Sequence, residues 1–352
     1  MPHRRGEHCE PSEEIFMKKV ISIIMILVLS ISLFSSCKKN DVVYNGSVML
    51  YTTIDEVAAM ALKSSFEKEY PGVVLDYYYG DLDGVSGKLD LEFESGQPNA
   101  DVVFLSSVLT LEDLKSKSRI EAYNSKEGKK IPAEYRDKDN FYYAGAVTTM
   151  GIGFNKSQDF GIDEKSAPKS WNDFLSKDFS GKMSLANPNS DDKVKYWVMA
   201  MMQNPNYGDN YFRKLKDCGV VIRSDEREVL DSIVGGVSSV GICYDETAAA
   251  FTKEFEDFKF QYSNSDNVTM MTGVALVKDA VNPVNGKLLI DYLLSKKGQE
   301  VLVANGLVSA RSDVKNVLKT KQVISKSLKV DLDDIMQKGN DYITNFYDIF
   351  GK

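Results

Sequence analysis

Several short groups of polar residues follow directly after apolar runs of this sequence. They comprise Thr52, Thr53, Asp55, Ser106, Ser107, Asn189, Ser190 and Tyr244. In parallel sheets, ligands bind just beyond the carboxyl ends of the strands, where such residues meet at one edge. Hydroxyl groups and helix N-termini gathered there are suited to holding a phosphate or a carboxylate. Helix capping by the hydroxyls, and a core role for Tyr244, are the structural alternatives.

The distribution of histidine excludes several kinds of chemistry. The two histidines, His3 and His8, both precede Met17. The remaining sequence therefore offers no Ser-His-Asp or Cys-His mechanism and no imidazole for zinc. It also contains no glycine loop of the phosphate-cradling type. We expect a binding protein and not an enzyme, with no catalytic residue and no catalytic cofactor.

The N-terminal part of the sequence predicts export. Lys18 and Lys19 precede the apolar run from Val20 to Phe34, and small residues lead to Cys37. This arrangement is typical of a secretory signal, here residues 17–36, and it is similar to a bacterial lipoprotein signal whose cysteine receives lipid. The acidic stretch 1–16 does not fit a signal, so we expect Met17 to be the natural start. An uncleaved membrane anchor is the alternative.

Export also bears on the remaining cysteines. Residues 37–46 read as a lipidated cysteine and a tether, which would hold the folded part outside the cytoplasm, facing the periplasm or the cell exterior.

Beyond them lie Cys218 and Cys243, at no recognisable motif spacing. One disulfide is conceivable in an oxidising compartment, but we favour buried free thiols.

Composition is that of an ordinary folded protein. The sequence is 43% hydrophobic and 27% charged, and its formal net charge is −8. A nucleic-acid-binding surface would need a basic excess, so nucleic acid is not an expected partner. The length that follows the tether favours two lobes over one.

Strand-like and helix-like segments alternate along the folded part, which predicts an α/β fold. Capping boxes are expected at Thr53 with Glu56 and at Ser170 with Asp173. The expected strands are 47–51, 73–79, 100–105, 182–186, 220–223 and 240–244. The expected helices include 53–70, one containing Tyr196 and Trp197, 247–255, 283–294, 298–305 and 331–350.

Two long β-prone segments, 141–156 and 268–277, are expected to cross between the lobes. They predict one lobe from 47–145 with 272–325, a second lobe from 146–271, and a C-terminal helix within 326–352. Two crossings with a cleft between the lobes form a hinge that can close around a ligand.

The ordered segments VMLYTTIDEVAAMALKSSFEKEYPGVVLDYYYGD, NADVVFLSS, SWNDFLSKDFSGKMSLANPNS, GGVSSVGICYDETAAAF and VNPVNGKLLIDYLLSKKGQEVLVANG carry a family resemblance. Together they resemble the ferric-ion-binding branch of the type 2 periplasmic solute-binding proteins of ABC importers, here in a lipoprotein form. That branch also contains relatives that bind phosphonates and sugar phosphates. The resemblance implies capture of a small solute between two lobes and delivery to a membrane permease driven by a cytoplasmic ATPase.

The resemblance also suggests site residues, with departures from the ferric pattern. Asp55 stands where ferric members often have His, Ser106 stands where they often have Glu, and one of their paired tyrosines is replaced in Cys243-Tyr244. The serine-containing anion loop corresponds to residues 187–191. Fe(III) would then be held by Asp55, Tyr244 and one of Tyr142 or Tyr143, with an exogenous anion.

The other ligand that stays open is a small phosphate-bearing or carboxylate anion held by the hydroxyl groups. A different class of function, a surface adhesin or interaction lipoprotein, is a further alternative because a two-lobed fold does not by itself prove transport. In either case we expect a monomer.

Overall fold

The computed structural model describes residues 44–157, 162–317 and 326–351. The chain divides into two units between Tyr44 and Asn45, and the account below concerns the unit that begins at Asn45. The predicted extension 1–16, the predicted signal 17–36, Cys37 and the tether up to residue 43 lie outside the described residues. No helix in the described ranges is long and apolar enough to cross a membrane.

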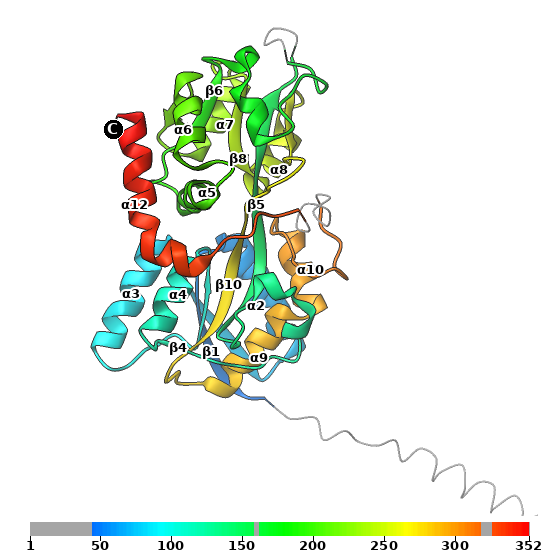
Figure 1. Cartoon of the computed structure of the whole chain (residues 1–352). Helices are drawn as coiled ribbons and strands as arrows, with labels where there is room; N and C mark the ends of the chain where they lie inside the picture. The colour runs from blue at the N-terminus through cyan, green and yellow to red at the C-terminus, as the bar shows by residue number, and fades with distance from the viewer. Residues whose placement is uncertain (1–43, 158–161, 318–325, 352) are drawn as a thin grey trace, which may run out of the picture. The chain divides into compact units, whose positions relative to one another are not determined.

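The described unit is an α/β structure built around one mixed sheet (Figure 1). The strands run in the order β2-β1-β3-β10-β5-β8-β6-β7. Two further strands join it, β4 beside β10 and β9 beside β5. The strands are β1 (Gly46–Thr52), β2 (Val73–Tyr79), β3 (Val102–Leu105), β4 (Ile120–Glu121), β5 (Tyr142–Asn155), β6 (Met183–Ala186), β7 (Val221–Arg223), β8 (Val240–Tyr244), β9 (Phe258–Gln261) and β10 (Thr269–Val277).

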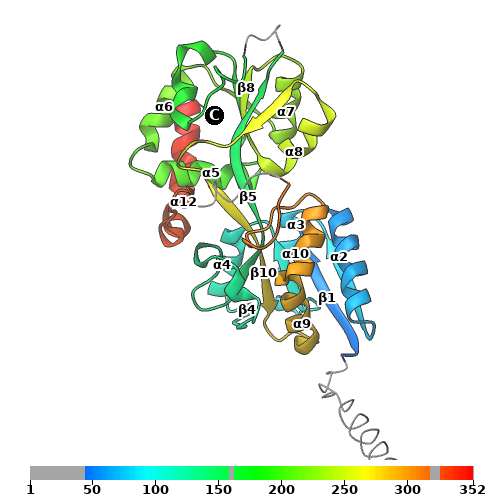
Figure 2. The same ribbon diagram turned by 90° about the vertical axis from the view of Figure 1, so that its right-hand side faces the viewer.

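The helices flank this sheet. The α-helices are α2 (Glu56–Glu69), α3 (Leu82–Glu94), α4 (Val108–Ser116), α5 (Asp192–Gln203), α6 (Gly208–Asp217), α7 (Glu226–Val234), α8 (Asp245–Glu254), α9 (Pro283–Leu294), α10 (Lys296–Ala304) and α12 (Leu332–Phe350). Short 3₁₀ helices lie at Gly128–Lys130, Ala133–Tyr135, Trp171–Leu175 and Lys177–Phe179. Helices α2, α9 and α10 pack together beside β1 and β10, so the late helices lie against the first part of the fold (Figure 2).

Two buried strands join the halves of the molecule, which confirms the predicted two-lobed fold. We call the part built on β1, β2 and β3 lobe 1, and the part built on β6, β7 and β8 lobe 2. The first half of β5 pairs with β10, and its second half pairs with β8 and β9. Every residue of β5 and of β10 is buried, which explains why their sequences are continuous apolar runs rather than alternating ones.

Local capping agrees with the sequence at one site and not at another. The box at Ser170 and Asp173 is confirmed, since each side chain accepts a hydrogen bond from the other residue's backbone. The box at Thr53 and Glu56 is wrong. Asp55 caps α2 by accepting a 2.8 Å bond from the Val57 N–H, because it is the acceptor directly before the first helical residue. The Thr53 hydroxyl instead accepts a 2.8 Å bond from the Ser106 N–H.

The C-terminal helix α12 packs on lobe 2 against α5 and α6. Its Phe346 is fully buried, and the ring lies edge-on to that of Phe212, with 5.5 Å between centroids. Phe212 in turn contacts Trp197 of α5. This aromatic contact buries a large apolar area and fastens α12 to the lobe.

Both cysteines of the described unit are free thiols, as favoured from the sequence. Cys243 is buried in β8, and Cys218 is partly buried at the end of α6.

Candidate functional site

A pocket of about 460 Å³ lies between the two lobes, at the ends of several strands. We call it the cleft pocket. It receives residues from the β1–α2 turn, the end of β3, helices α5 and α8, strand β10 and the turn after α10. The lining residues are Thr53, Ile54, Asp55, Ser106, Lys193, Glu246, Thr247, Ala250, Thr272, Asn305, Gly306 and Leu307. Its size is within the usual range of small-ligand sites.

The lobe 1 wall is built from two neighbouring strand ends. The Thr53 N–H donates to the Phe104 carbonyl over 3.1 Å, and the Ser106 N–H donates to the Thr53 hydroxyl. These bonds tie the β1 and β3 ends together and hold both hydroxyl groups beside the cavity. Because parallel strands present their carboxyl ends on one edge, this wall follows directly from the order β1-β3 in the sheet.

The lobe 2 wall carries Lys193, in the first turn of α5. Its ammonium lies 2.6 Å from Glu246 Oε2 and 4.2 Å from the centre of the Tyr244 ring. The other carboxylate oxygen of Glu246 accepts a 2.6 Å bond from the Thr148 hydroxyl. Burial opposes the charged lysine, but the Glu246 carboxylate outweighs this and raises the pKa of Lys193. The lysine is therefore a fixed, partly desolvated cation at the pocket wall.

Two buried carboxyl groups lie behind this wall. Glu226 accepts a 2.8 Å bond from the Tyr244 N–H, and burial raises its pKa to about 8. Asp245 accepts bonds from the Thr149 N–H and the Tyr262 hydroxyl, and burial together with the neighbouring Glu246 raises its pKa to about 7. At neutral pH Glu226 is largely protonated, so these two groups add less than two negative charges behind Lys193.

Only part of the sequence-predicted ligand set lines the cleft pocket. Thr53, Asp55 and Ser106 do. The fully buried Thr52 uses its hydroxyl to donate to the Phe104 carbonyl over 3.0 Å, and the Ser107 hydroxyl caps α4 by accepting from the Thr110 N–H. Thr52 and Ser107 therefore hold the strand ends that carry their neighbours.

The predicted anion loop is occupied by its own contacts. The Ser190 hydroxyl lies within hydrogen-bond distance of the Asn187 and Ser224 carbonyl oxygens, and the Asn189 N–H donates to Asn187 Oδ1. Asp191 caps α5 by accepting from the N–H groups of Lys193 and Val194. A carboxylate thus takes the place that a bound anion would need at this helix N-terminus. Neither Asn189 nor Ser190 lines the cleft pocket.

The predicted tyrosine ligands are dispersed. The Tyr244 hydroxyl donates to Asp191 Oδ2 over 3.1 Å, beneath Lys193. Tyr142 and Tyr143 are both buried at the lobe 1 end of β5, where the Tyr142 hydroxyl meets Glu112 and the Tyr143 hydroxyl donates to the Tyr123 carbonyl. None of the three tyrosines is a lining residue of the cleft pocket. Across the described residues, no group of three or more His, Cys, Asp and Glu side chains is arranged to hold a metal ion.

Of the charged residues that line the pocket, sequence reasoning identified Asp55 and missed the other two. Lys193 and Glu246 were not among the candidates, nor were Thr247, Thr272 and the turn Asn305–Leu307. A usable signal existed for Lys193, because it lies in the first turn of the helix that follows the predicted anion loop. For the turn after α10 we find no signal in the sequence.

Similar proteins are found by sequence. The phosphoglycerate transport regulatory protein PgtC of Salmonella typhimurium is 24% identical over 276 residues, which cover 77% of this chain and 66% of that protein. The chain therefore spans slightly less than two thirds of the length of this curated relative.

Similar proteins are also found among solved structures. Iron-bound HitA from Pseudomonas aeruginosa aligns with a TM-score of 0.72 at 16% identity, covering 86% of this chain and 99% of that one. AfuA from Actinobacillus pleuropneumoniae, with fructose-6-phosphate bound, aligns with a TM-score of 0.68 at 20% identity, covering 88% and 99%. At these identities the alignments establish the fold, which is that of the periplasmic binding proteins.

A family model described as bacterial extracellular solute-binding protein matches residues 97–337. That match spans β3 to the first turns of α12, and so includes both crossing strands and most of the cleft pocket. Since it covers more than half of the chain, this protein belongs to the bacterial extracellular solute-binding proteins.

Proposed function

We propose that this protein is the ligand-binding component of an importer and that its cleft pocket captures a small phosphate-bearing anion. The observation that carries the proposal is the position of Lys193. It is a partly desolvated cation on the lobe 2 wall of a pocket whose lobe 1 wall presents Thr53 and Ser106. A phosphate group carries nearly two negative charges and several acceptor oxygens, which such a wall can satisfy once the lobes close.

The ligands of similar proteins support this class of solute. The Salmonella relative is named for phosphoglycerate transport, and AfuA has been solved with a sugar phosphate. On this proposal Glu246 holds Lys193 while the pocket is empty and is displaced in part when the phosphate arrives. Thr247 and Thr272 are further hydroxyl groups within reach of the solute.

Ferric iron with an exogenous anion is the second candidate, because HitA of the same fold has been solved with iron. The candidate donors Asp55, Tyr142, Tyr143 and Tyr244 favour it less. Asp55 already caps α2, the Tyr244 hydroxyl is bonded to Asp191, and the two tyrosines of β5 are engaged within lobe 1. Iron would require at least Tyr244 to break its bond and lose its proton, although burial and the acids around it raise its pKa.

The remaining parts of the proposal concern export, membrane attachment and the transport partners. We infer that the signal 17–36 exports the chain and that lipid on Cys37 holds it at a membrane. A monomer would then pass its solute to a permease driven by a cytoplasmic ATPase. The lobe limits 47–145 with 272–325 and 146–271 remain predictions, as does the separate C-terminal segment 326–352. No catalytic step is part of the proposal.

A ligand screen by thermal unfolding tests the function. The purified protein, stripped of ligand, is titrated with 3-phosphoglycerate, fructose-6-phosphate, phosphonates and ferric citrate at equal ionic strength. A ligand that binds only the folded state raises the midpoint as its concentration exceeds Kd. We expect shifts with phosphorylated solutes and none with iron. A shift with iron alone, accompanied by a tyrosinate-to-iron absorption band, would support the ferric candidate, and no shift at all would favour the adhesin alternative.

A further inference from the structure

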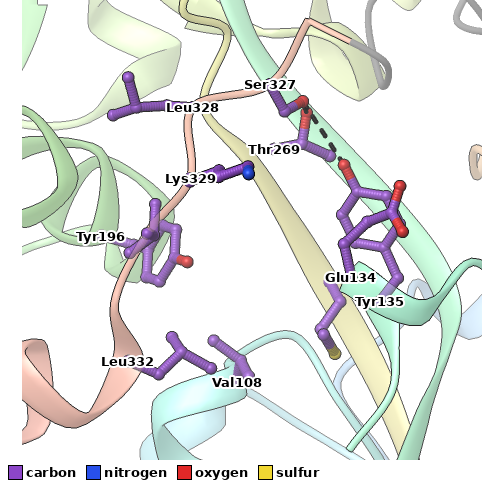
Figure 3. A pocket seen from close by; sticks show the side chains of 11 residues that line it. Val108, Glu134, Tyr135, Tyr196, Thr269, Ser327, Leu328, Lys329 and Leu332 are labelled. Atoms are coloured by element: carbon purple, nitrogen blue, oxygen red, sulfur yellow. Dashed lines mark hydrogen bonds between the residues drawn. The ribbon is translucent and has the colours of Figure 1, made fainter.

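A second cavity lies on the other side of the crossing strand β10 from the cleft pocket. Its volume is about 570 Å³, and we call it the rear pocket (Figure 3). Thr269 and Met271 of β10 line it, whereas Thr272 of the same strand lines the cleft pocket. Alternate side chains of a strand point to opposite faces, so the two cavities are separate sites.

The rear pocket is lined by both lobes and by the segment that leads into α12. Val108 comes from lobe 1, Tyr196 from helix α5 of lobe 2, and Leu332 from the first turn of α12. Leu328 and Val330 add further apolar surface from the segment before α12. These side chains form an apolar lining on which a hydrocarbon or aromatic group can be buried.

Two tyrosines bring hydroxyl groups to this lining. The Tyr135 hydroxyl lies 3.4 Å from the Ser327 hydroxyl, which lies 2.7 Å from that of Thr269. Tyr196 is only 7% exposed and its hydroxyl points into the cavity, yet it has no hydrogen-bond partner among the described residues. The hydroxyl oxygen is accessible from the cavity, so it can form a hydrogen bond with a polar group of a bound ligand.

The rim carries one charge of each sign. The Lys329 ammonium is directed toward the cavity from the segment before α12, and Glu134 comes from the lobe 1 side. Neither side chain forms an ion pair with any residue in the described ranges. A simple anion would meet repulsion from Glu134, and a simple cation would meet it from Lys329. A zwitterion satisfies both.

We propose that the rear pocket is a second ligand site, and that it takes an apolar α-amino acid in its zwitterionic form. The carboxylate is bound by the Lys329 ammonium and the Tyr196 hydroxyl, the ammonium by the Glu134 carboxylate. The apolar side chain lies against Val108, Met271 and Leu332. This site is independent of the solute held in the cleft pocket.

L-phenylalanine is the probe for this site. Isothermal titration of the purified protein is expected to show saturable binding. 3-Phenylpropionate, which lacks the ammonium, and phenethylamine, which lacks the carboxylate, are expected to bind at least about tenfold more weakly. If phenylalanine shows no binding at concentrations up to about 10 mM, the proposal is overturned. Equal binding of 3-phenylpropionate overturns it too.

Matched variants test whether phenylalanine binds in the rear pocket. Lys329→Gln, Glu134→Gln and Tyr196→Phe should each weaken phenylalanine binding by about fivefold or more. Lys326→Gln removes an exposed lysine of the same segment that does not line the cavity, and it should bind as wild type does. Lys193→Gln in the cleft pocket should also leave phenylalanine binding unchanged. If phenylalanine binding is lost in Lys193→Gln or retained in full by Lys329→Gln, the rear pocket is not its site.

Discussion

The ammonium of Lys193 and the carboxylate of Glu246 lie 2.6 Å apart on the lobe 2 wall of the cleft pocket. Their side chains are about one fifth exposed, at 19% and 22%. The pair therefore sits where solvent or a ligand reaches it, but where the dielectric screening is weaker than on the open surface. The positive charge that Lys193 can offer a solute therefore depends on how strongly Glu246 holds it.

Removing the lysine tests its role. Lys193→Gln should weaken the binding of a phosphate-bearing solute by about tenfold or more, because a charge-assisted hydrogen bond contributes about 1.5–3 kcal/mol. Isothermal titration with fructose-6-phosphate measures the change. Lys195→Gln, on the same helix but outside the pocket lining, is the matched control and should bind as wild type does. If both variants lose the same affinity for the solute, binding depends on the overall charge of lobe 2 and not on a direct contact with Lys193.

The ring and the hydroxyl of Tyr244 should have different effects. Tyr244→Phe keeps the ring under the Lys193 ammonium and should change affinity for a phosphate-bearing solute by less than about threefold. Tyr244→Leu removes the ring and should weaken binding further, since cation–π contacts contribute about 0.5–2 kcal/mol. Titration of both variants measures the difference. A complete loss of binding in Tyr244→Phe would instead make the hydroxyl a direct ligand.

Ser190→Ala should affect folding and not binding. The Ser190 hydroxyl bridges toward the Asn187 and Ser224 carbonyls, so its removal should lower the free energy of unfolding by about 1 kcal/mol. Chemical unfolding measures the loss, and titration should give an unchanged Kd. The opposite pattern, normal stability with weakened binding, would support the sequence-based prediction of an anion site at Asn189 and Ser190.

Stability should fall as pH rises from about 4.5 to 8. Burial raises the pKa of Glu226 from 4.5 in the unfolded chain to about 8 in the native protein. Between these values the native state holds a proton that the unfolded state has released, so the free energy of unfolding decreases with rising pH, by up to about 1.4 kcal/mol per pH unit. Asp245, whose pKa is raised to about 7, acts in the same direction.

Urea unfolding of wild type and Glu226→Gln across this range measures the effect. The variant cannot exchange the proton, so its slope should be shallower than that of wild type. Glu228→Gln, an exposed substitution on the same helix with the native pKa lowered instead of raised, should not flatten the slope. Identical slopes in wild type and Glu226→Gln would remove Glu226 from this explanation.

The attachment of α12 should depend on its aromatic contact with lobe 2. Phe346→Ala should reduce the free energy of unfolding by about 3–5 kcal/mol, because it leaves a cavity beside Phe212. Met336→Ala, at a side chain that is 44% exposed on the same helix, should change it by less than about 0.5 kcal/mol. If the two variants have the same free energy of unfolding, the contact of Phe346 with Phe212 contributes little to the stability of lobe 2.

Much of the fold could be predicted because buried strands and capped helices leave local patterns. The predicted bounds of β2, β8 and α9 match the structure, and the crossing strands stood out as continuous apolar runs. Helices α6 and α7 and strand β9 were missed. Strand β9 has only four residues and gives a weak signal. Helix α6 does carry an amphipathic pattern, with Tyr211, Phe212 and Leu215 on its buried face, so the sequence contained a usable signal for it.

The site was harder to predict than the fold. The carboxyl-end rule depends only on strand order, and the strand ends that it singled out place Thr53, Asp55 and Ser106 along the cleft pocket. It could not show that Asp191 would cap α5 or that Lys193 and Glu246, far apart in the sequence, would meet across the lobe. Nor could it tell which end of β5 faces the cleft, and so Tyr142 and Tyr143 were included although both are engaged within lobe 1.

The most direct test of the proposed solute is the affinity of Glu246→Gln. Neutralising this carboxylate frees Lys193 and removes a negative charge from the pocket. The protein should then bind fructose-6-phosphate or 3-phosphoglycerate more tightly than wild type, by about three- to tenfold. Ferric iron prefers anionic oxygen donors, so an iron site would lose affinity with the same change. Tighter binding of the phosphorylated solute in Glu246→Gln is the predicted result, and weaker binding, or ferric binding that falls in step with the lost carboxylate, would contradict the account.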